Sequence, residues 1–220
     1  MHQQQARPRP SRVAGAAGPF LLLVVLLGVT MVVALGIGAV SIPVGTVTDV
    51  VLRRLGADLD VSLLDDQIVW QLRMPRVLGA AATGAGLALC GAVLQSLTRN
   101  DLADPYLLGI SGGAAVGAVS VIVLGVSVAG IVSATMITLG AFVGALVSLA
   151  LVLLLATGRS GTLPPARTVL AGVAIGQVCA AYTSFVVIMS GDHDAARRVL
   201  SWTLGSLAGL RWHSSLFLCA

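Results

Sequence analysis

The residues of this chain that could carry out bond chemistry are few and scattered. His193 stands between Asp192 and Asp194, but one histidine in a polar loop is an incomplete set of metal ligands. Serine, cysteine, histidine and carboxylate residues are not arranged as a nucleophile with its base. Three cysteines lie in apolar runs without Cys-x-x-Cys spacing, as small hydrophobic residues do: Cys90, Cys179 and Cys219. We therefore expect no catalytic residues, no metal site and no cofactor.

The charged residues exclude two further kinds of chemistry. All 13 basic residues are arginine and all 9 acidic residues are aspartate, so the chain contains no lysine. A phosphate-binding loop of the form GxxxxGK[ST] requires a lysine, so any ATP that drives this protein must bind to another chain. The net charge is +4, but the arginines form no basic stripe, so nucleic acid is not an expected partner.

The longest uncharged stretch lies between Asp104 and Arg159, where 54 residues carry no charged side chain. A hydrocarbon core about 30 Å thick is crossed by roughly 20 helical residues, so this stretch predicts two crossings and a turn. The chain is 57% hydrophobic and 10% charged, with a mean hydropathy of +0.98, whereas about a quarter of the residues in soluble domains are charged. The composition therefore indicates a protein embedded in a lipid bilayer.

Apolar runs separated by polar or proline-containing segments predict an all-α, polytopic membrane helix bundle. We expect about five complete transmembrane helices and the start of a sixth near Trp212, in one domain over residues 1–220. The five predicted spans cover residues 13–40, 77–97, 106–126, 131–156 and 168–189. Pro75 suits the first turn of the second span, and residues 201–210 are expected to form a short helix after a polar loop.

The N-terminal segment sets the predicted orientation. Residues 1–12 are polar and contain three arginines, which favours a cytoplasmic tail by the positive-inside rule. Residues 41–71 then form an extracytoplasmic loop, although over the whole chain six arginines fall inside and seven outside. A signal peptide also starts with positive charge, but its apolar region is only about 7–15 residues long, so a retained span is favoured. The expected location is the plasma (inner) membrane.

Within the loop of residues 41–71, an apolar stripe follows helical spacing. Its members share one face of a helix: Val44, Val47, Val51, Leu52 and Leu55. The stripe predicts a short amphipathic helix on the outer membrane surface, and an irregular loop is the alternative.

Small residues recur every four positions in the predicted spans. Such ridges let helix backbones approach closely and indicate a compact bundle. The clearest ridges are Gly109, Gly113 and Gly117 in the third span, Gly140, Gly144 and Ser148 in the fourth, and Gly172, Gly176, Ala180 and Ser184 in the fifth.

Two groups of motifs are more specific than composition. The first contains Gln71-Leu72-Arg73-Met74-Pro75-Arg76, then Gly84, Gly91, Gln95, the segment Arg99–Pro105, Leu108-Gly109 and Gly113-Ala114. The second contains Leu170-Ala171-Gly172-Val173-Ala174, then Trp202, Gly205-Ser206 and Trp212. In order and spacing, over residues 20–220, these motifs resemble the FecCD family of ABC-transporter permeases. One departure is Asn100-Asp101-Leu102-Ala103, where the family pattern has Asn-Pro-Leu-Ala.

The resemblance implies a transport function and an assembly. Members of the family import iron–siderophore complexes, haem or cobalamin by alternating access. Each permease subunit has about ten spans, and two such subunits, identical or different, enclose a path at their interface. Two ATP-binding subunits dock on the cytoplasmic side and a substrate-binding protein docks outside. On this basis the chain supplies the first five and a half spans and is a truncated permease that lacks the cytoplasmic coupling helices.

The resemblance also assigns a role to an outer arginine. Arg73 matches the family arginine at the outer mouth, which implies docking of a carboxylate on the binding protein. Arginine–carboxylate hydrogen bonds are strong and can be bidentate. The residues alone favour another interpretation, in which Arg73 and Arg76 flank a span and extend to the membrane interface.

A gate and a path are implied in and before the fifth span. Pro164, Pro165 and Arg167 match the inner gate region of the family, and an ordinary turn is the alternative. The fifth span is expected to line the path, because polar groups in a span face protein or water rather than lipid. Its polar candidates are Gln177, Tyr182, Thr183 and Ser184.

Two other functions remain as alternatives. An ion-coupled secondary transporter would need an ionisable side chain within a span, and none of the predicted spans has an aspartate, arginine or histidine in its middle. An inactive, truncated membrane fragment is the other alternative, because the chain ends inside the sixth predicted span.

Overall fold

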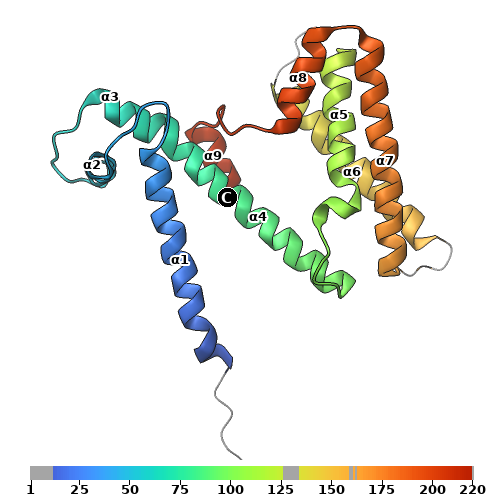
Figure 1. The fold of residues 1–220 in the computed structure, drawn as a ribbon, viewed down its shortest axis with the longest axis horizontal. Helices are drawn as coiled ribbons and strands as arrows, with labels where there is room; N and C mark the ends of the chain where they lie inside the picture. The colour runs from blue at the N-terminus through green and yellow to red at the C-terminus, as the bar shows by residue number, and fades with distance from the viewer. Residues whose placement is uncertain (1–11, 126–133, 159–160, 162, 220) are drawn as a thin grey trace, which may run out of the picture. The chain divides into compact units, whose positions relative to one another are not determined.

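The computed structural model describes residues 12–125, 134–158, 161 and 163–219, and they fall into two compact units. Unit 1 combines the described residues up to Thr83 with those from Leu207 onward, and unit 2 is formed by Gly84–Ser206. Throughout the described ranges the regular structure is helical, without strands (Figure 1). This confirms the predicted all-α membrane bundle.

Unit 1 is built around the end of its first helix. Its elements are α1 (Arg12–Gly36), α2 (Val44–Arg54), α3 (Leu63–Asp66), the π-helical segment η1 (Gln67–Arg73), the first part of α4 (Met74–Thr98), and α9 (Trp212–Cys219). Side chains from α1, α2, η1 and the loops between them form one apolar core: Leu35, Ile42, Val47, Val50, Val61 and Val69. This core fixes the segment between the first two long helices.

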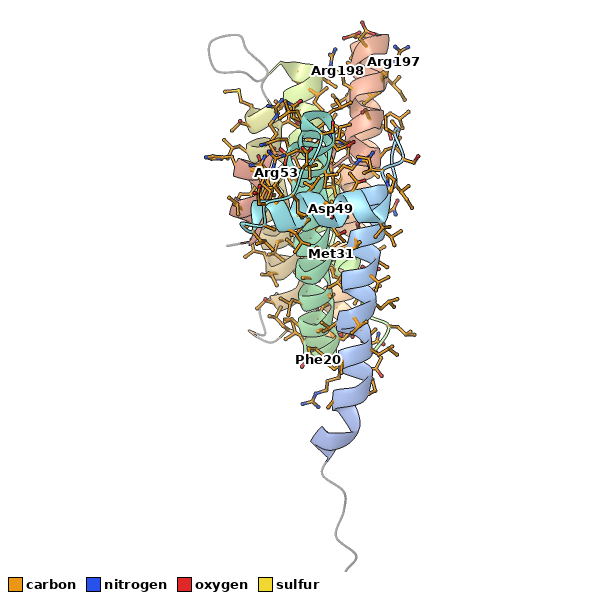
Figure 2. The ribbon with its side chains drawn as sticks, turned by 90° about the vertical axis from the view of Figure 1, so that its left-hand side faces the viewer. Phe20, Met31, Asp49, Arg53, Arg197 and Arg198 are labelled. Atoms are coloured by element: carbon orange, nitrogen blue, oxygen red, sulfur yellow. The ribbon has the colours of Figure 1, made fainter. Side chains whose placement is uncertain are left out.

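The amphipathic helix expected within residues 41–71 is confirmed as α2. Of the predicted stripe, Val47 is buried in the core together with Val50, whereas Val44, Leu52 and Leu55 are exposed. Figure 2 shows α2 crossing the end of α1, and labels its charged residues Asp49 and Arg53. The position of α2 on an outer membrane surface remains a prediction.

The second span does not begin at Pro75. The helix continues from Leu63 through η1 into α4 and ends at Thr98. Proline lacks an N–H and its ring collides with the carbonyl four residues earlier, so a regular α-helix is disfavoured there. The chain widens instead into a π-helical segment, in which the Met74 N–H donates to the carbonyl of Val69, five residues earlier. The prediction of a helix start missed this alternative for accommodating a proline.

Unit 2 packs three helices side by side (Figure 1). After the 3₁₀ turn η2 (Pro105–Leu108) come α5 (Ile110–Leu124), α6 (Ala134–Thr157), α7 (Pro165–Ser190) and α8 (His193–Leu204). The three helices that pack together are α5, α6 and α7. The small-residue ridges predicted in the third and fourth spans lie at the α5–α6 contact, where a Cβ atom added at Gly117 or Gly144 would collide with the facing backbone. The bundle is therefore held by close backbone approach.

The helix after the fifth span lies earlier than residues 201–210, so that prediction is wrong in position. Gly191, at φ 61°, ends α7, and the Asp192 carboxylate accepts from the Asp194 N–H at 2.8 Å. This N-cap starts α8 at His193. The hydrogen bond from the Asp194 backbone is also the main reason that the pKa of Asp192 lies below its usual value.

Four described helices are long and apolar enough to cross a membrane: residues 17–36, 63–98, 134–157 and 165–190. The predicted third span appears as η2 followed by α5, whose 15 residues extend only about 22 Å at 1.5 Å per residue. Residues 126–133, which hold the junction of the predicted third and fourth spans, lie outside the described residues. The helix α9 begins at Trp212, where the sixth span was predicted.

Candidate functional site

Arg73 lies at the end of η1 and is half-buried. Its Nη1 donates to the carbonyl oxygen of Leu35 at 2.7 Å, and its Nη2 donates to the carbonyl oxygen of Val40. Both acceptors belong to the end of α1 or the turn after it. The guanidinium is thus held by the chain itself, and its five N–H groups leave donors beyond these two hydrogen bonds.

Arg76 follows one helical turn later and contacts a different segment. Its Nη2 donates to the carbonyl oxygen of Ala208 at 2.7 Å, and its buried Nε makes no hydrogen bond among the described residues. The side chain of Leu210, from the same segment, covers Gly79. A concavity of about 410 Å³ is lined by both arginines and by apolar residues of α1, the turn after it, and η1. The motif therefore places two arginines at one depression in unit 1.

A second charged group of unit 1 escaped the sequence analysis. Arg54 forms a bidentate pair with the buried carboxylate of Asp66, with 3.0 Å between Nε and Oδ1. The two hydrogen bonds from Arg54 give the buried Asp66 carboxylate partners on both of its oxygens. The guanidinium also lies 5.5 Å from the centre of the Trp70 ring, within the range of a cation–π contact.

The Trp70 ring also packs against the ring of Trp212. Their ring centres are 4.9 Å apart, and the Trp212 Nε1 donates to the Trp70 carbonyl at 2.8 Å. The partners are 142 residues apart in sequence, so no local pattern could have shown this pair. Together these contacts fix the beginning of α9 on η1.

The four predicted path-lining residues do not share one face of α7. Tyr182 faces α5, where its hydroxyl lies 2.9 Å from the Ser120 hydroxyl. Gln177 and Ser184 are exposed and seven residues apart, which places them on the same face of the helix. Thr183 is half-buried and donates to the Ala180 carbonyl at 2.9 Å.

A groove of about 450 Å³ runs between α5, α7 and α8 in unit 2. It includes the hydroxyl side chains of Thr183, Ser184 and Thr203, and its remaining lining is apolar. Of the predicted path residues, only Thr183 and Ser184 line this groove.

The predicted gate residues lie at the start of α7. Pro164 is its N-cap and Pro165 its first residue, a position that suits proline because the missing N–H would have no helical partner. The Arg167 Nη1 lies 3.5 Å from the Ala156 carbonyl at the end of α6. A cation there complements the negative end of the α6 dipole.

The remaining site prediction concerned a metal. His193 begins α8, but its side chain is outside the described ones. Among the described residues, histidine, cysteine and aspartate side chains do not gather in groups of three that could hold an ion. Of the N-terminal tail expected in the cytoplasm, residues 1–12, residues 1–11 are also outside the described part.

Comparison with known proteins gives consistent results. The sequence profile of the FecCD transport family matches residues 23–220. The chain is 44% identical over 147 residues to the "Cobalamin import system permease protein BtuC" of Halobacterium salinarum, covering 66% of this chain and 37% of that protein. It is 41% identical over 152 residues to the "Vitamin B12 import system permease protein BtuC" of Serratia proteamaculans, covering 69% and 44%. The chain thus spans less than half the length of these relatives.

A solved structure is similar as well. It is described as an ABC transporter of the metal-chelate type in an inward-facing conformation, and it matches with a TM-score of 0.70 and 28% sequence identity. The match covers 90% of this chain and 56% of the other. The profile match over most of the chain, the arginine motif at the junction of η1 and α4, and the apolar helices agree with one another, and the chain belongs to the FecCD transport family.

Proposed function

We propose that the full-length protein is the transmembrane permease subunit of an ATP-binding-cassette importer that works by alternating access. The observation that carries this proposal is the family match over residues 23–220, supported by relatives named as import permeases. The four long apolar helices fit a subunit that lies within a membrane. The protein itself catalyses no bond chemistry in this proposal.

The proposed partners follow from the family. A second permease subunit completes the path, two ATP-binding subunits supply the driving energy, and an extracytoplasmic protein delivers the cargo. The absence of lysine from this chain supports ATP binding on another polypeptide, because the phosphate-binding loop needs one. We place the protein in the plasma (inner) membrane, with its N-terminus in the cytoplasm and residues 41–71 outside.

The proposed cargo is a bulky metal chelate, either an iron–siderophore complex or a corrinoid or haem. Relatives are named as cobalamin and vitamin B12 permeases, and the similar solved structure is described as of metal-chelate type. The exposed face of α7 with Gln177 and Ser184, and the groove that Thr183 and Ser184 line, supply hydroxyl and amide groups suited to a polar chelate. Pro164, Pro165 and Arg167 at the start of α7 would form the inner gate.

Cargo uptake tests the transport function. In a strain whose full-length gene is deleted, accumulation of one labelled chelate should fall to the level of passive entry and return when the gene is restored. Ferric siderophores, haem and cyanocobalamin are compared in parallel, with an unrelated amino acid as the control. Undiminished uptake of all three chelates in the deletion strain, with no other importer of its kind present, would refute the proposal.

Docking of the binding protein tests the role of Arg73. In Arg73→Glu, capture of the cargo-loaded binding protein by the full-length permease should weaken at least about tenfold, because a like charge replaces a charge-assisted bond. Membrane insertion should be unchanged. Arg197→Glu, on α8, carries the same charge change and serves as the control. Unaltered capture by the Arg73 variant would remove the docking role.

A further inference from the structure

The carbonyl groups at the C-terminal end of α1 need hydrogen-bond donors from outside the helix. The last four carbonyl groups of a helix lack partners within the helix. Here the Val33 carbonyl accepts from the Ile37 N–H at 3.1 Å, and the Gly36 carbonyl accepts from the Ile42 N–H at 2.9 Å. The Leu35 carbonyl lies between them and accepts from the side chain of Arg73 at 2.7 Å.

Arg73 suits this position for two physical reasons. A cation complements the negative end of the helix dipole, and the flat guanidinium can donate to two acceptors at once. Its second acceptor is the Val40 carbonyl in the turn between α1 and α2. One side chain, 38 residues away in sequence, thus binds both the helix end and the turn that follows it.

The turn itself contains a glycine that the arginine needs. A Cβ atom at Gly38 would lie 2.7 Å from the Arg73 Nη2 and 3.0 Å from its Cζ. Gly38 is not among the glycines with positive φ, so its backbone conformation is open to other residues. The lack of a side chain therefore serves the close approach of the guanidinium.

Buried side chains on either side make the turn a fixed element. Leu35 and Ile42 are 4% and 5% exposed, and both belong to the core that also holds Val47 of α2. Any shift of the turn would disturb this core. The placement of α2 against α1 therefore depends on the segment that Arg73 holds.

We infer that Arg73 is a positioning residue that caps α1 and fixes the turn leading to α2, with Gly38 as its required partner. The same contacts hold the guanidinium still, so its remaining N–H donors face an incoming carboxylate in one orientation. This link to docking rests on the proposed function, whereas the capping does not.

A double-mutant cycle tests the capping in the full-length permease without any binding protein. Amide hydrogen exchange over residues 35–43 is compared in wild type, Gly38→Ala, Arg73→Ala and the double variant. Each single change should speed exchange about tenfold or more, since hydrogen bonds to a charged group are lost. The double variant should exchange no faster than Arg73→Ala, because the alanine methyl then meets empty space.

Matched controls make the outcome decisive. Gly45→Ala in α2, where an added Cβ meets nothing within 4 Å, should exchange no faster than wild type. Arg73→Gln replaces Arg73→Ala in the cycle if the latter does not insert. Gly38→Ala exchanging like the Gly45 control, or effects that simply add in the double variant, would overturn the capping.

The salt dependence of capture tests the link to docking. In Gly38→Ala, the affinity for the binding protein should fall by about the same factor as amide exchange over residues 35–43 rises. The slope of affinity against salt concentration should stay that of wild type, because the arginine charge is kept. Arg73→Gln should weaken capture and also flatten this slope. If Gly38→Ala captured the binding protein as well as wild type does, the proposal that the turn positions Arg73 for docking would be refuted. No capture even by wild type would reject the proposed function and leave the exchange result standing.

Discussion

Replacing Gly117 by alanine is expected to prevent stable packing of α5 on α6. A Cβ atom at Gly117 would overlap the backbone of Gly140, and the helices could relieve this overlap only by moving apart, which would break the close contact between Gly113 and Gly144 one turn away. Overpacking of this kind costs about 3 kcal/mol, which is a large fraction of the stability of a typical domain.

The measurement is the yield and melting temperature of the detergent-solubilised full-length protein. The Gly117→Ala variant should give little monodisperse protein and melt several degrees lower. Gly28→Ala in α1, where an added Cβ meets nothing within 4 Å, should behave like wild type. Equal melting of the two variants would show that the α5–α6 backbones are farther apart than the structure has them.

Replacing Gly109 by alanine is expected to have the second large effect. Gly109 joins η2 to α5 at φ 67°, and a Cβ there would lie 2.8 Å from the Gly172 carbonyl oxygen in α7. The left-handed conformation alone costs a non-glycine residue roughly 1–2 kcal/mol. The collision with α7 adds to this cost, and it also disturbs the buried hydrogen bond of 2.8 Å from the Ser148 hydroxyl to the Gly109 carbonyl.

Gly125 separates the two contributions. It has a similar φ of 64°, but an added Cβ there meets none of the described residues within 4 Å. Gly125→Ala should therefore show only the conformational cost, and Gly109→Ala should melt clearly lower in the same thermal scan. If both variants lose the same stability, the proposed contact between η2 and α7 is not present in the folded protein.

Hydropathy and small-residue spacing were enough to predict the main helices and to mark a face on which a helix packs closely. The apolar runs correspond to α1, α4, α6 and α7, because each must bury its backbone hydrogen bonds inside the bilayer. The four-residue spacing of Gly113 and Gly117 marked the face of α5 that meets α6. Both signals are local properties of one helix, which a sequence displays directly.

The contacts in unit 1 could not be predicted, because they join distant segments. The Arg54–Asp66 pair spans 12 residues, the Arg73 bond to Leu35 spans 38 and the Trp212 bond to Trp70 spans 142. Only the fold brings these groups together. From the sequence, Arg73 was expected either to flank the membrane interface or to dock the binding protein, and neither interpretation included its contact with α1.

The fold separates the four polar residues predicted to line a path along the fifth span. Polar residues were expected to face the protein interior or the path, and Tyr182 does face α5 through its contact with Ser120. Helical periodicity separates Tyr182 from Gln177 and Ser184, which lie on the exposed face. The path that we propose along α7 would therefore involve the latter pair.

The most direct test is transport by the full-length permease in sealed proteoliposomes, assembled with its ATP-binding subunits and its loaded binding protein. We predict accumulation of the labelled metal chelate only when ATP is supplied on the side of the ATP-binding subunits, and none when those subunits are left out. Accumulation that proceeds without them, driven by an ion gradient alone, would contradict the account.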